Sequence, residues 1–251
     1  MDFFKSAQAV NRFEYVTQTG STNTDLVAQA SANPSDFPSF SVLVAGAQTA
    51  GRGRTGRVWV SPPEKSLAIS VLVRPSAWSK EDFGWLPLAA GVAMRSAVKV
   101  ALPHAEVGLK WPNDVQVSGK KISGILSELL PDASGVVIGA GINLSLELSE
   151  LPIPESTSLL LEGWTGSPDD FLLVYLKKLS ELLSDVNLVR AQVKNDCNTI
   201  GLRVRAIFPD HSEAVGVAVG IDESGRLLIN VDEQSQLFAV SAADIQHLRH
   251  N

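Results

Sequence analysis

The chain has 251 residues, of which 45% are hydrophobic and 19% are charged, and its formal net charge is −6. This composition excludes a disordered chain and fits one large domain, or a domain with a small appendage. The negative balance argues against a general nucleic-acid binder, because such proteins carry a broad basic face.

A single cysteine, Cys197, excludes an internal disulfide and favours a reducing compartment. The first residues lack the basic and apolar regions of a signal peptide, and the apolar runs are too short to span a membrane. We therefore expect a cytoplasmic protein that does not contact membranes. A lone cysteine near a helix end is more often inert than catalytic, so we expect no nucleophile there.

The first elements alternate between helix and strand patterns. Thr22–Asp25 fits a capping box and predicts a helix to about residue 32. Short β-branched runs predict buried strands over 40–48 and 66–75. An alanine-rich segment predicts a helix over 85–102.

The middle of the chain predicts further strands. Residues 107–117 and 120–130 have the pattern of two strands that flank a turn at Ser118–Lys120. Residues 135–146 predict another strand, whose internal glycines would let a ligand approach the backbone.

The last third begins with a helix and ends in short strands. Ser167 followed by Pro168 predicts the start of a long amphipathic helix that continues to about Val189. After Cys197 the pattern becomes that of a small all-β barrel. Its predicted strands are 202–208, 213–220, 226–231 and 236–240.

The stretch "GRGRTGRV", Gly51–Val58, superficially matches three nucleotide-binding patterns. A dinucleotide-binding site needs a helix directly after the glycines, and the following "WVSPP" cannot begin one. A P-loop needs lysine and serine or threonine where this chain has Arg57 and Val58. Kinases place a lysine strand and an H-R-D loop between their glycine loop and DFG, so Asp82-Phe83-Gly84 is expected to be only a loop before a helix.

Charge and flexibility are what remain distinctive in this loop. Three arginines on glycine hinges can wrap an anionic group, become ordered on contact and exclude water from it. A solvated basic loop or a nucleic-acid patch is the alternative on loop composition alone.

The stretch "LKWPNDV" adds a second cation. Lys110 lies between Leu109 and Trp111 in a strand pattern, which suits an ammonium that stabilises negative charge on a carboxylate and a phosphate. Asn113 and Asp114 could add an amide and a carboxylate to the same site. The alternative is a lysine that reaches solvent from a strand end, beside an ordinary turn.

Five motifs occur together in order: "STNTD" (21–25), "QTAGRGRTGRVW" (48–59), "LKWPNDV" (109–115), "KKISGIL" (121–126 with Lys120 before it) and "GAGIN" (139–143). With them the chain closely resembles the bacterial biotin–protein ligases of the monofunctional type. The resemblance covers nearly the whole chain. It implies an α+β fold with a central mixed sheet flanked by helices, over residues 1–197, and a C-terminal SH3-like β-barrel over 198–251.

The resemblance implies a two-step reaction. Biotin and ATP give biotinyl-5′-AMP, and a lysine of a biotin carboxyl carrier domain then accepts the biotinyl group. Mg²⁺ is expected with ATP; the sequence does not identify its ligand, and Asp114 is only a candidate. The partner would be that carrier domain and not DNA, because no helix-turn-helix domain is expected. The protein would be a monomer or a homodimer.

The resemblance also implies site residues. Lys110 and Arg54 would be catalytic. Biotin would be bound by Ser21, Thr22, Asn23, Gln48, Arg52, Gly53, Arg54, Lys110 and Gly124. ATP and the adenylate would be bound by Arg52, Arg54, Arg57, Trp59, Lys110, Asn113 and Asn143. Thr55 stands where the motif often has arginine, a loss that Arg57 could compensate.

Two other functions remain as alternatives. A lipoate–protein ligase would use a similar catalytic fold, although "GRGRTGR" and "KWPND" fit biotin better. An RNA-binding module is less consistent with the acidic net charge and with the few aromatic residues of the tail.

Overall fold

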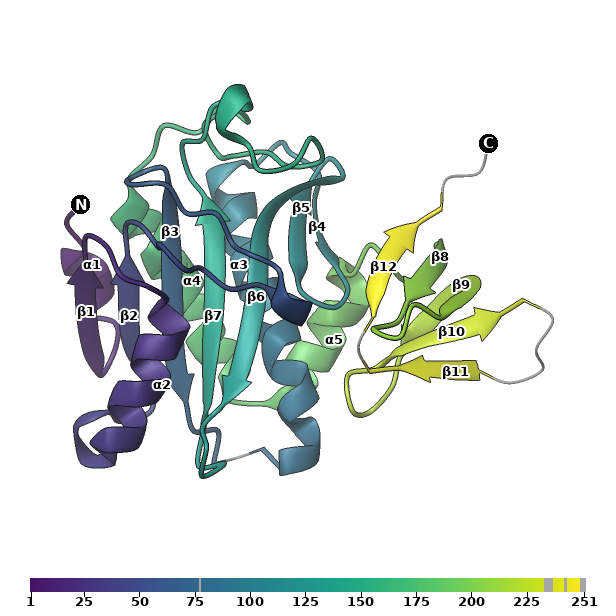
Figure 1. The fold of residues 1–251 in the computed structure, drawn as a ribbon, viewed down its shortest axis with the longest axis horizontal. Helices are drawn as coiled ribbons and strands as arrows, with labels where there is room; N and C mark the ends of the chain where they lie inside the picture. Colours follow the sequence, from purple (N-terminus) through teal and green to yellow (C-terminus); the bar gives the residue numbers. More distant parts are fainter. Residues whose placement is uncertain (77, 233–236, 242, 249–251) are drawn as a thin grey trace.

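A mixed seven-stranded sheet forms the centre of the larger part of the molecule (Figure 1). The computed structural model describes residues 1–76, 78–232, 237–241 and 243–248. The strand order is β1-β2-β3-β7-β6-β5-β4, with β1 and β2 parallel and every other neighbour antiparallel. The strands are β1 (Arg12–Val16), β2 (Ser41–Ala45), β3 (Ser66–Val73), β4 (Val107–Lys110), β5 (Asp114–Val117), β6 (Lys120–Leu129) and β7 (Val136–Asn143).

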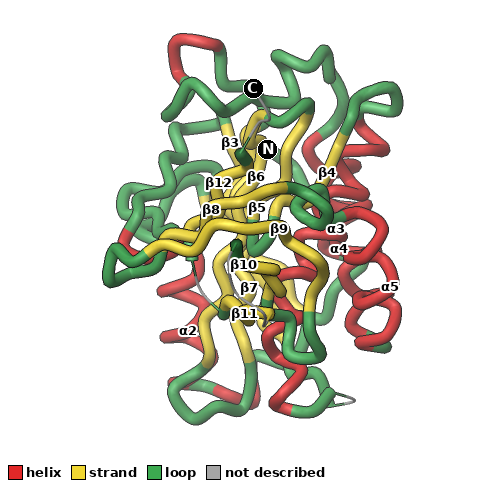
Figure 2. Tube along the Cα trace, turned by 90° about the vertical axis from the view of Figure 1, so that its right-hand side faces the viewer, coloured by secondary structure: helices red, strands yellow, loops and turns green. Residues whose placement is uncertain are grey.

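Helices cover both faces of this sheet, as the predicted α+β class requires (Figures 1 and 2). One face is covered by α2 (Thr22–Ala32), which contacts β2, β3 and β7. The opposite face is covered by α3 (Leu86–Ala101), against which α4 (Pro168–Leu183) packs. The four-residue helix α1 (Phe4–Ala7) contacts α4, and α5 (Val186–Asp196) contacts α3.

The start of α2 differs from the predicted capping box. The helix begins at Thr22 after Ser21, and Ser21 makes no side-chain capping bond. Instead, Thr22 Oγ1 lies 3.1 Å from Gln48 Oε1 and 2.8 Å from Ser70 Oγ. The hydroxyl that sequence reasoning assigned to helix capping is thus used across the sheet face.

The predicted strand over 107–117 is a hairpin of two strands. β4 ends at Lys110 and β5 begins at Asp114, and these two residues pair across the hairpin. Pro112 interrupts the ladder because it has no backbone N–H to donate, so the chain turns at this point. The turn places Lys110 and Asp114 side by side at one end of the hairpin.

The predicted long helix to Val189 is also two helices. α4 ends at Leu183, and Asp185 caps α5 by accepting a hydrogen bond from Asn187 N at 2.8 Å. Aspartate is a strong N-cap residue, so a new helix begins there. The predicted start of α4 is confirmed, because the Ser167 side chain caps it and Pro168 occupies the first turn. The DFG segment is likewise a 3₁₀ helix, Lys80–Trp85, that continues into α3.

The C-terminal strands form a separate antiparallel sheet in the order β11-β10-β9-β8-β12 (Figure 2). This is the SH3-like unit that the resemblance implied. Sequence reasoning missed its fifth strand, β12, and residues 233–236, 242 and 249–251 of the predicted domain lie outside the described residues. The strands are β8 (Arg203–Ile207), β9 (Glu213–Ile221), β10 (Leu227–Val231), β11 (Leu237–Val240) and β12 (Asp244–His247).

Cys197 is buried at the end of α5, and burial raises the pKa of its thiol. A buried, protonated thiol is a poor nucleophile, in keeping with the inert role expected for it. Across the described residues, every helix falls short of the length and apolar character needed to cross a bilayer.

Candidate functional site

A cavity of about 720 Å³ opens on the α2 face of the large sheet and extends to the C-terminal sheet. Its volume is within the usual range for small-molecule sites. Its walls come from the start of α2, the segment 48–61, and strands β6 and β7. On the side of the C-terminal sheet, the cavity is lined by Phe208, His211 and Asp244.

All of the residues that sequence reasoning assigned to biotin or ATP line this one cavity, although they come from distant segments. They are Ser21, Thr22, Asn23, Gln48, Arg52, Gly53, Arg54, Arg57, Trp59, Lys110, Asn113, Gly124 and Asn143. Asp114 lines it too. The individual roles of these residues stay predictions.

The polar end of the cavity lies at the start of α2. Ser21, Thr22 and Asn23 are buried, and Gln48 Oε1 accepts a hydrogen bond from Thr22 N at 2.8 Å. Ser70 Oγ lies 2.6 Å from Asn23 Oδ1. Buried polar groups are expensive unless bonded, so this network fixes the directions of the side chains that face the cavity.

Glu128 belongs to the same network and was missed by sequence reasoning. Its carboxylate accepts a hydrogen bond from Asn23 Nδ2 at 2.9 Å and pairs with Arg52 Nη1 at 2.9 Å. Glu128 therefore ties the arginine segment to β6 and to α2. Glu128 is the penultimate residue of β6, whose sequence KKISGILSEL contains several polar residues, so its sequence position gave no signal of this role.

Residues 48–61 form a hairpin over the sheet, which we call the flap (Figure 1, dark blue). Isolated bridges pair Gln48 with Ser61 and Arg52 with Val58. A Cβ at Gly51 would overlap the carbonyl oxygen of Trp59, so close backbone approach requires glycine there. At the tip, Thr55 has φ 53°, a left-handed conformation in which a β-branched residue is strained.

The flap arginines have different environments. Arg54 Nη1 donates to Asn113 Oδ1 at 3.3 Å, and burial lowers the pKa of its guanidinium. Arg57 is more exposed and pairs with Asp244 of β12 at 2.7 Å, which raises the pKa of Arg57 and lowers that of Asp244. One cation is thus largely unneutralised inside the cavity, while the other joins the flap to the C-terminal sheet.

Lys110 is the last residue of β4 and is half-buried at the cavity wall. Its cross-strand neighbour, Asp114, is bound by Lys121 Nζ at 2.7 Å. Asp114 is therefore already paired with a cation in this structure. Lys121, which sequence reasoning did not assign, is a further cation lining the cavity.

The Trp59 indole packs against two glycines of the sheet. A Cβ at Gly141 would overlap its indole, and a Cβ at Gly124 would lie 3.2 Å from its Cζ3. Gly124 and Gly141 pair across β6 and β7, so together they make the space that the ring occupies. Lys121, which lies on β6 like Gly124, places its Nζ 5.9 Å from the centroid of the Trp59 ring. Sequence reasoning expected glycine at these strands to admit a ligand; here it admits the flap tryptophan.

Two asparagines support the far end of the cavity. Asn143 is buried and donates from Nδ2 to Thr157 O at 2.9 Å. Asn113 donates from Nδ2 to Ile125 O at 2.9 Å, which turns its Oδ1 toward Arg54. Both amides are fixed by backbone partners and keep their remaining polar atoms in defined directions.

The site as a whole is a cavity that is covered on one side by the flap and has several cationic side chains in its wall. Arg54, Lys110 and Lys121 place positive charge on its wall, and the flap can exclude water from what it covers. No group of three or more histidine, cysteine, aspartate or glutamate residues is arranged for metal binding in the described part of the chain. Phosphate or carboxylate is thus the ligand chemistry that the wall favours.

Two family models match the chain. The model described as the biotin/lipoate A/B protein ligase family matches residues 15–143, and the biotin protein ligase C-terminal domain matches residues 199–248. The first match contains the flap, Lys110 and Asn143, and the second contains the C-terminal sheet. Thus each matched segment supplies part of the cavity wall.

Named relatives and solved structures agree with these matches. A biotin–[acetyl-CoA-carboxylase] ligase of Mycobacterium tuberculosis is 40% identical over 246 residues, covering 95% of this chain and 90% of that protein. The bifunctional ligase/repressor BirA of Escherichia coli is 31% identical over 213 residues, which cover 78% of this chain and 64% of that protein. The biotin protein ligase of Aquifex aeolicus, solved with biotin and ATP, has a TM-score of 0.79 and 27% identity, over 95% of this chain and all of that chain.

Proposed function

The chain belongs to the biotin/lipoate A/B protein ligase family, and on that premise we propose that it is a biotin–protein ligase. It activates biotin with ATP to biotinyl-5′-AMP and transfers the biotinyl group to a lysine of a biotin carboxyl carrier domain. The observation that carries this proposal is a cavity whose wall brings the arginines of the flap together with Lys110.

The first step joins two anions. A carboxylate oxygen of biotin attacks the α-phosphorus of ATP, the bond to the bridging oxygen breaks, and pyrophosphate leaves. Arg54 and Lys110 offset the repulsion between carboxylate and phosphate, and each charge-assisted contact contributes roughly 1.5–3 kcal/mol. Binding both reactants in one cavity supplies the proximity that the reaction needs.

The buried cluster at the start of α2 supports a biotin subsite at the polar end of the cavity. Thr22, Asn23 and Gln48 present amide and hydroxyl groups whose directions are fixed by Ser70 and Glu128. A neutral ring with a ureido group needs such fixed donors and acceptors, whereas the carboxylate end needs cations. The polar cluster at the start of α2 is separate from the cations of the cavity wall. This arrangement fits a ligand that has a neutral ring at one end and a carboxylate at the other.

The second step is an acyl transfer. The neutral ε-amine of the acceptor lysine attacks the carbonyl carbon of the mixed anhydride, AMP leaves, and the nitrogen loses a proton as the amide forms. The anhydride is prone to hydrolysis, so a flap that covers it protects the intermediate until the carrier arrives.

We propose that the nucleotide enters as Mg·ATP, with the metal held chiefly by phosphate oxygens. Mg²⁺ commonly binds through substrate phosphates with one or two carboxylates. The carboxylates that line the cavity, Asp114 and Asp244, are paired with Lys121 and Arg57, so the structure favours no particular protein ligand. A cytoplasmic location is part of the proposal, because ATP and the carboxylase carrier domains are intracellular substrates.

The proposed function is tested by mass measurement of a biotin carboxyl carrier domain after incubation with the protein, biotin and Mg·ATP. We expect a gain of one biotinyl group, and none when the acceptor lysine of the carrier is replaced by arginine. Because the matched family also includes lipoate ligases, a parallel incubation contains lipoate and a lipoyl acceptor domain. Modification with lipoate but not with biotin would contradict the proposal.

Lys110→Ala tests the assigned catalytic role. Loss of an ammonium that contacts both anions is expected to slow biotin-dependent pyrophosphate release by more than about 100-fold. Thermal unfolding should change little, because Lys110 is half-buried at a cavity wall and not in the core. A folded variant that releases pyrophosphate at the wild-type rate would show that the assignment is wrong.

A further inference from the structure

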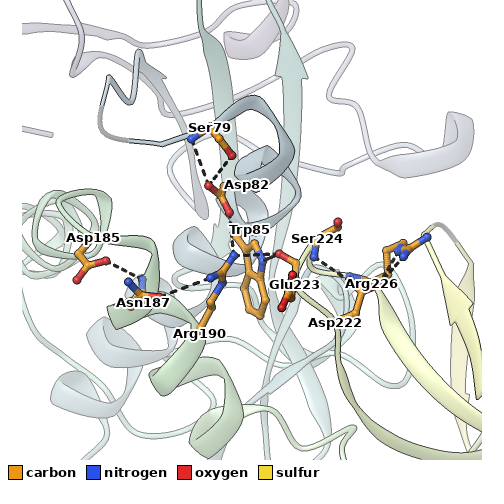
Figure 3. A network of polar contacts seen from close by, with 10 residues as sticks. All are labelled: Ser79, Asp82, Trp85, Asp185, Asn187, Arg190, Asp222, Glu223, Ser224 and Arg226. Carbon is orange, nitrogen blue, oxygen red and sulfur yellow. Dashed lines mark hydrogen bonds and ion pairs between the residues drawn. The ribbon is translucent and has the colours of Figure 1, made fainter.

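The turn between β9 and β10, residues 222–226, reaches from the C-terminal sheet to the helices of the large sheet (Figure 3). The carbonyl oxygen of Glu223 accepts hydrogen bonds from Trp85 Nε1 at 2.7 Å and from Arg190 Nη2 at 3.1 Å. Arg190 Nη2 also pairs with Asp82 Oδ1 at 2.8 Å. One carbonyl of the C-terminal sheet is therefore held by the start of α3 and by α5 together.

This turn has a fixed shape of its own. Asp222 Oδ1 accepts from Ser224 N and from Arg226 N, each at 3.0 Å, and Asp222 Oδ2 accepts from Arg226 Nε at 2.7 Å (Figure 3). Gly225 has φ 83°, in the left-handed region that favours glycine. The carbonyl groups of the turn consequently point in defined directions before they meet the large sheet.

The 222–226 turn packs against Gly84 of the DFG segment. A Cβ at Gly84 would overlap the carbonyl oxygen of Ser224, and a Cβ at Gly225 would lie 2.9 Å from the carbonyl oxygen of Gly84. Asp82 two residues earlier binds Arg190. The aspartate and the glycine that resemble a kinase motif thus serve a backbone-to-backbone contact between the two sheets.

The same turn reaches the residue next to Lys110. Trp111 is buried, and its Nε1 donates to the carbonyl oxygen of Gly225 at 3.1 Å. Trp111 N donates to Thr199 Oγ1 at 3.0 Å, and Asn198 N donates to Leu109 O at 2.8 Å. Both residues that flank Lys110 are therefore held by the C-terminal part of the chain.

Strand β4 needs such support because it is the edge of the large sheet. An edge strand has a ladder of hydrogen bonds on one side only, so its end is less constrained than that of a central strand. On the helix side, Leu109 fills the space left by Gly91 of α3. On its outer edge, β4 is bordered by Asn198 and Thr199.

From these contacts we propose that the 222–226 turn and Asn198–Thr199 position Lys110 for adenylation, with Trp111 as the connecting residue. The proposal rests on the adenylation proposed above, in which Lys110 contacts substrate. Trp111, Gly84 and Arg190 are positioning residues, because they act through Lys110. The C-terminal sheet thereby affects catalysis through the backbone of β4, in addition to the part of the cavity wall that it supplies.

The first test is Gly84→Ala, which pushes the turn away, compared with Gly220→Ala, where an added Cβ meets nothing within 4 Å. We expect kcat for pyrophosphate release to fall about 10-fold or more in Gly84→Ala with KM for biotin nearly unchanged, because a small displacement of a catalytic group is costly. Transfer from supplied biotinyl-5′-AMP to the carrier should fall much less, since the repulsion between the anions has already been overcome. Gly220→Ala should behave as wild type.

The second test does not require backbone movement. Trp111→Phe removes the indole N–H but keeps an aromatic ring, and it should show the same selective loss of the first step. Arg190→Met should also lower kcat for pyrophosphate release, and Arg190→Lys should recover part of it because an ammonium can still bond to Glu223 O. Lys194→Met, at an exposed position of the same helix, is the matched control.

Folded variants with the wild-type kcat for pyrophosphate release would overturn the proposal. An equal loss in both half-reactions would also overturn it, because that result indicates a general loss of structure. If wild type and all variants alike release no pyrophosphate with biotin, the proposed function fails and this inference fails with it.

Discussion

Arg54 and Arg57 lie three positions apart in the flap, but their side chains make different contacts. Arg57 is neutralised by Asp244, whereas the Arg54 guanidinium hydrogen-bonds, among the described residues, only to the neutral side chain of Asn113. Burial disfavours the charged form of Arg54, which lowers its pKa. An anion bound beside Arg54 would stabilise its charged form and offset the cost of burial. This guanidinium therefore favours a phosphate or a carboxylate as its ligand.

We therefore predict that Arg54→Ala retains adenylate poorly. Biotin activation should continue at a reduced rate, but biotinyl-5′-AMP should leave the cavity faster and biotinylate exposed lysines of bystander proteins. The measurement is biotin incorporation into serum albumin in the presence of Mg·ATP, together with the dissociation rate of biotinyl-5′-AMP. Arg12→Ala, on strand β1 at the opposite edge of the sheet, is the control. Equal retention of the adenylate by Arg54→Ala and wild type would contradict the role.

At the scale of elements, local patterns predicted most of the large sheet. β3 and α3 differ from their predicted ranges by one or two residues, because buried β-branched runs and alanine-rich periodicity are strong local signals. Strand β1 (Arg12–Val16) was not predicted, and two further failures occurred where one residue divides an apparently continuous pattern. Pro112 divides the hairpin of β4 and β5, and Asp185 divides the helices α4 and α5.

Strand β12 shows why part of the site could not be predicted. It has only four residues, and its sequence "DIQH" lacks the apolar alternation typical of a strand. Its Asp244 and His247 reach Arg57 and Thr199, which are 187 and 48 positions away in the sequence. The flap and "LKWPNDV" were found because each carries its chemistry in one segment, whereas these contacts exist only after the two sheets meet.

His247, on β12, makes the free energy of unfolding depend on pH. Burial and then the charge of Lys110 lower the pKa of His247 from 6.5 to about 4. As the pH falls below about 6.5, the unfolded chain binds a proton that the folded protein does not, so the free energy of unfolding decreases until about pH 4. Above about pH 6.5 the contribution is fully present.

We predict that His247→Gln reduces this pH dependence. Glutamine can still hydrogen-bond to Thr199 Oγ1 but does not titrate, so the urea midpoint should decrease less between about pH 7 and pH 5 than in wild type. His104→Gln, which changes an exposed histidine, should retain the wild-type dependence. The same decrease in all three proteins would show that His247 is not the titrating group.

At the scale of the whole molecule, the two sheets meet in two different ways. The 222–226 turn packs against buried tryptophans and glycine backbone, which is a contact with little freedom. The pair of Arg57 and Asp244 is exposed and joins the C-terminal sheet to the flap. The first contact can hold the sheets together while the second opens and closes.

The ion pair between Arg57 and Asp244 is weak enough to break and form again. The side chains of Arg57 and Asp244 are 63% and 43% exposed, and exposed ion pairs contribute about 0.2–1 kcal/mol. Such a pair shifts the balance between open and closed flap by about 1.4- to 5-fold. It favours closure without preventing substrate entry, and a phosphate can replace Asp244 as the partner of Arg57.

We predict that Asp244→Asn opens the flap of the protein without substrates. Limited trypsin digestion should then cleave after Arg52, Arg54 or Arg57 about 1.4- to 5-fold faster than in wild type, because cleavage follows the population of the open state. Addition of biotin and Mg·ATP should protect both proteins, since the anions of the substrates then hold the arginines. Asp232→Asn, which removes the partner of Arg203 in the same sheet, should leave flap cleavage unchanged. If Asp244→Asn and wild type are cleaved at the same rate without substrates, the flap closes through its own contacts and the C-terminal sheet affects the site through the 222–226 turn and the cavity wall alone.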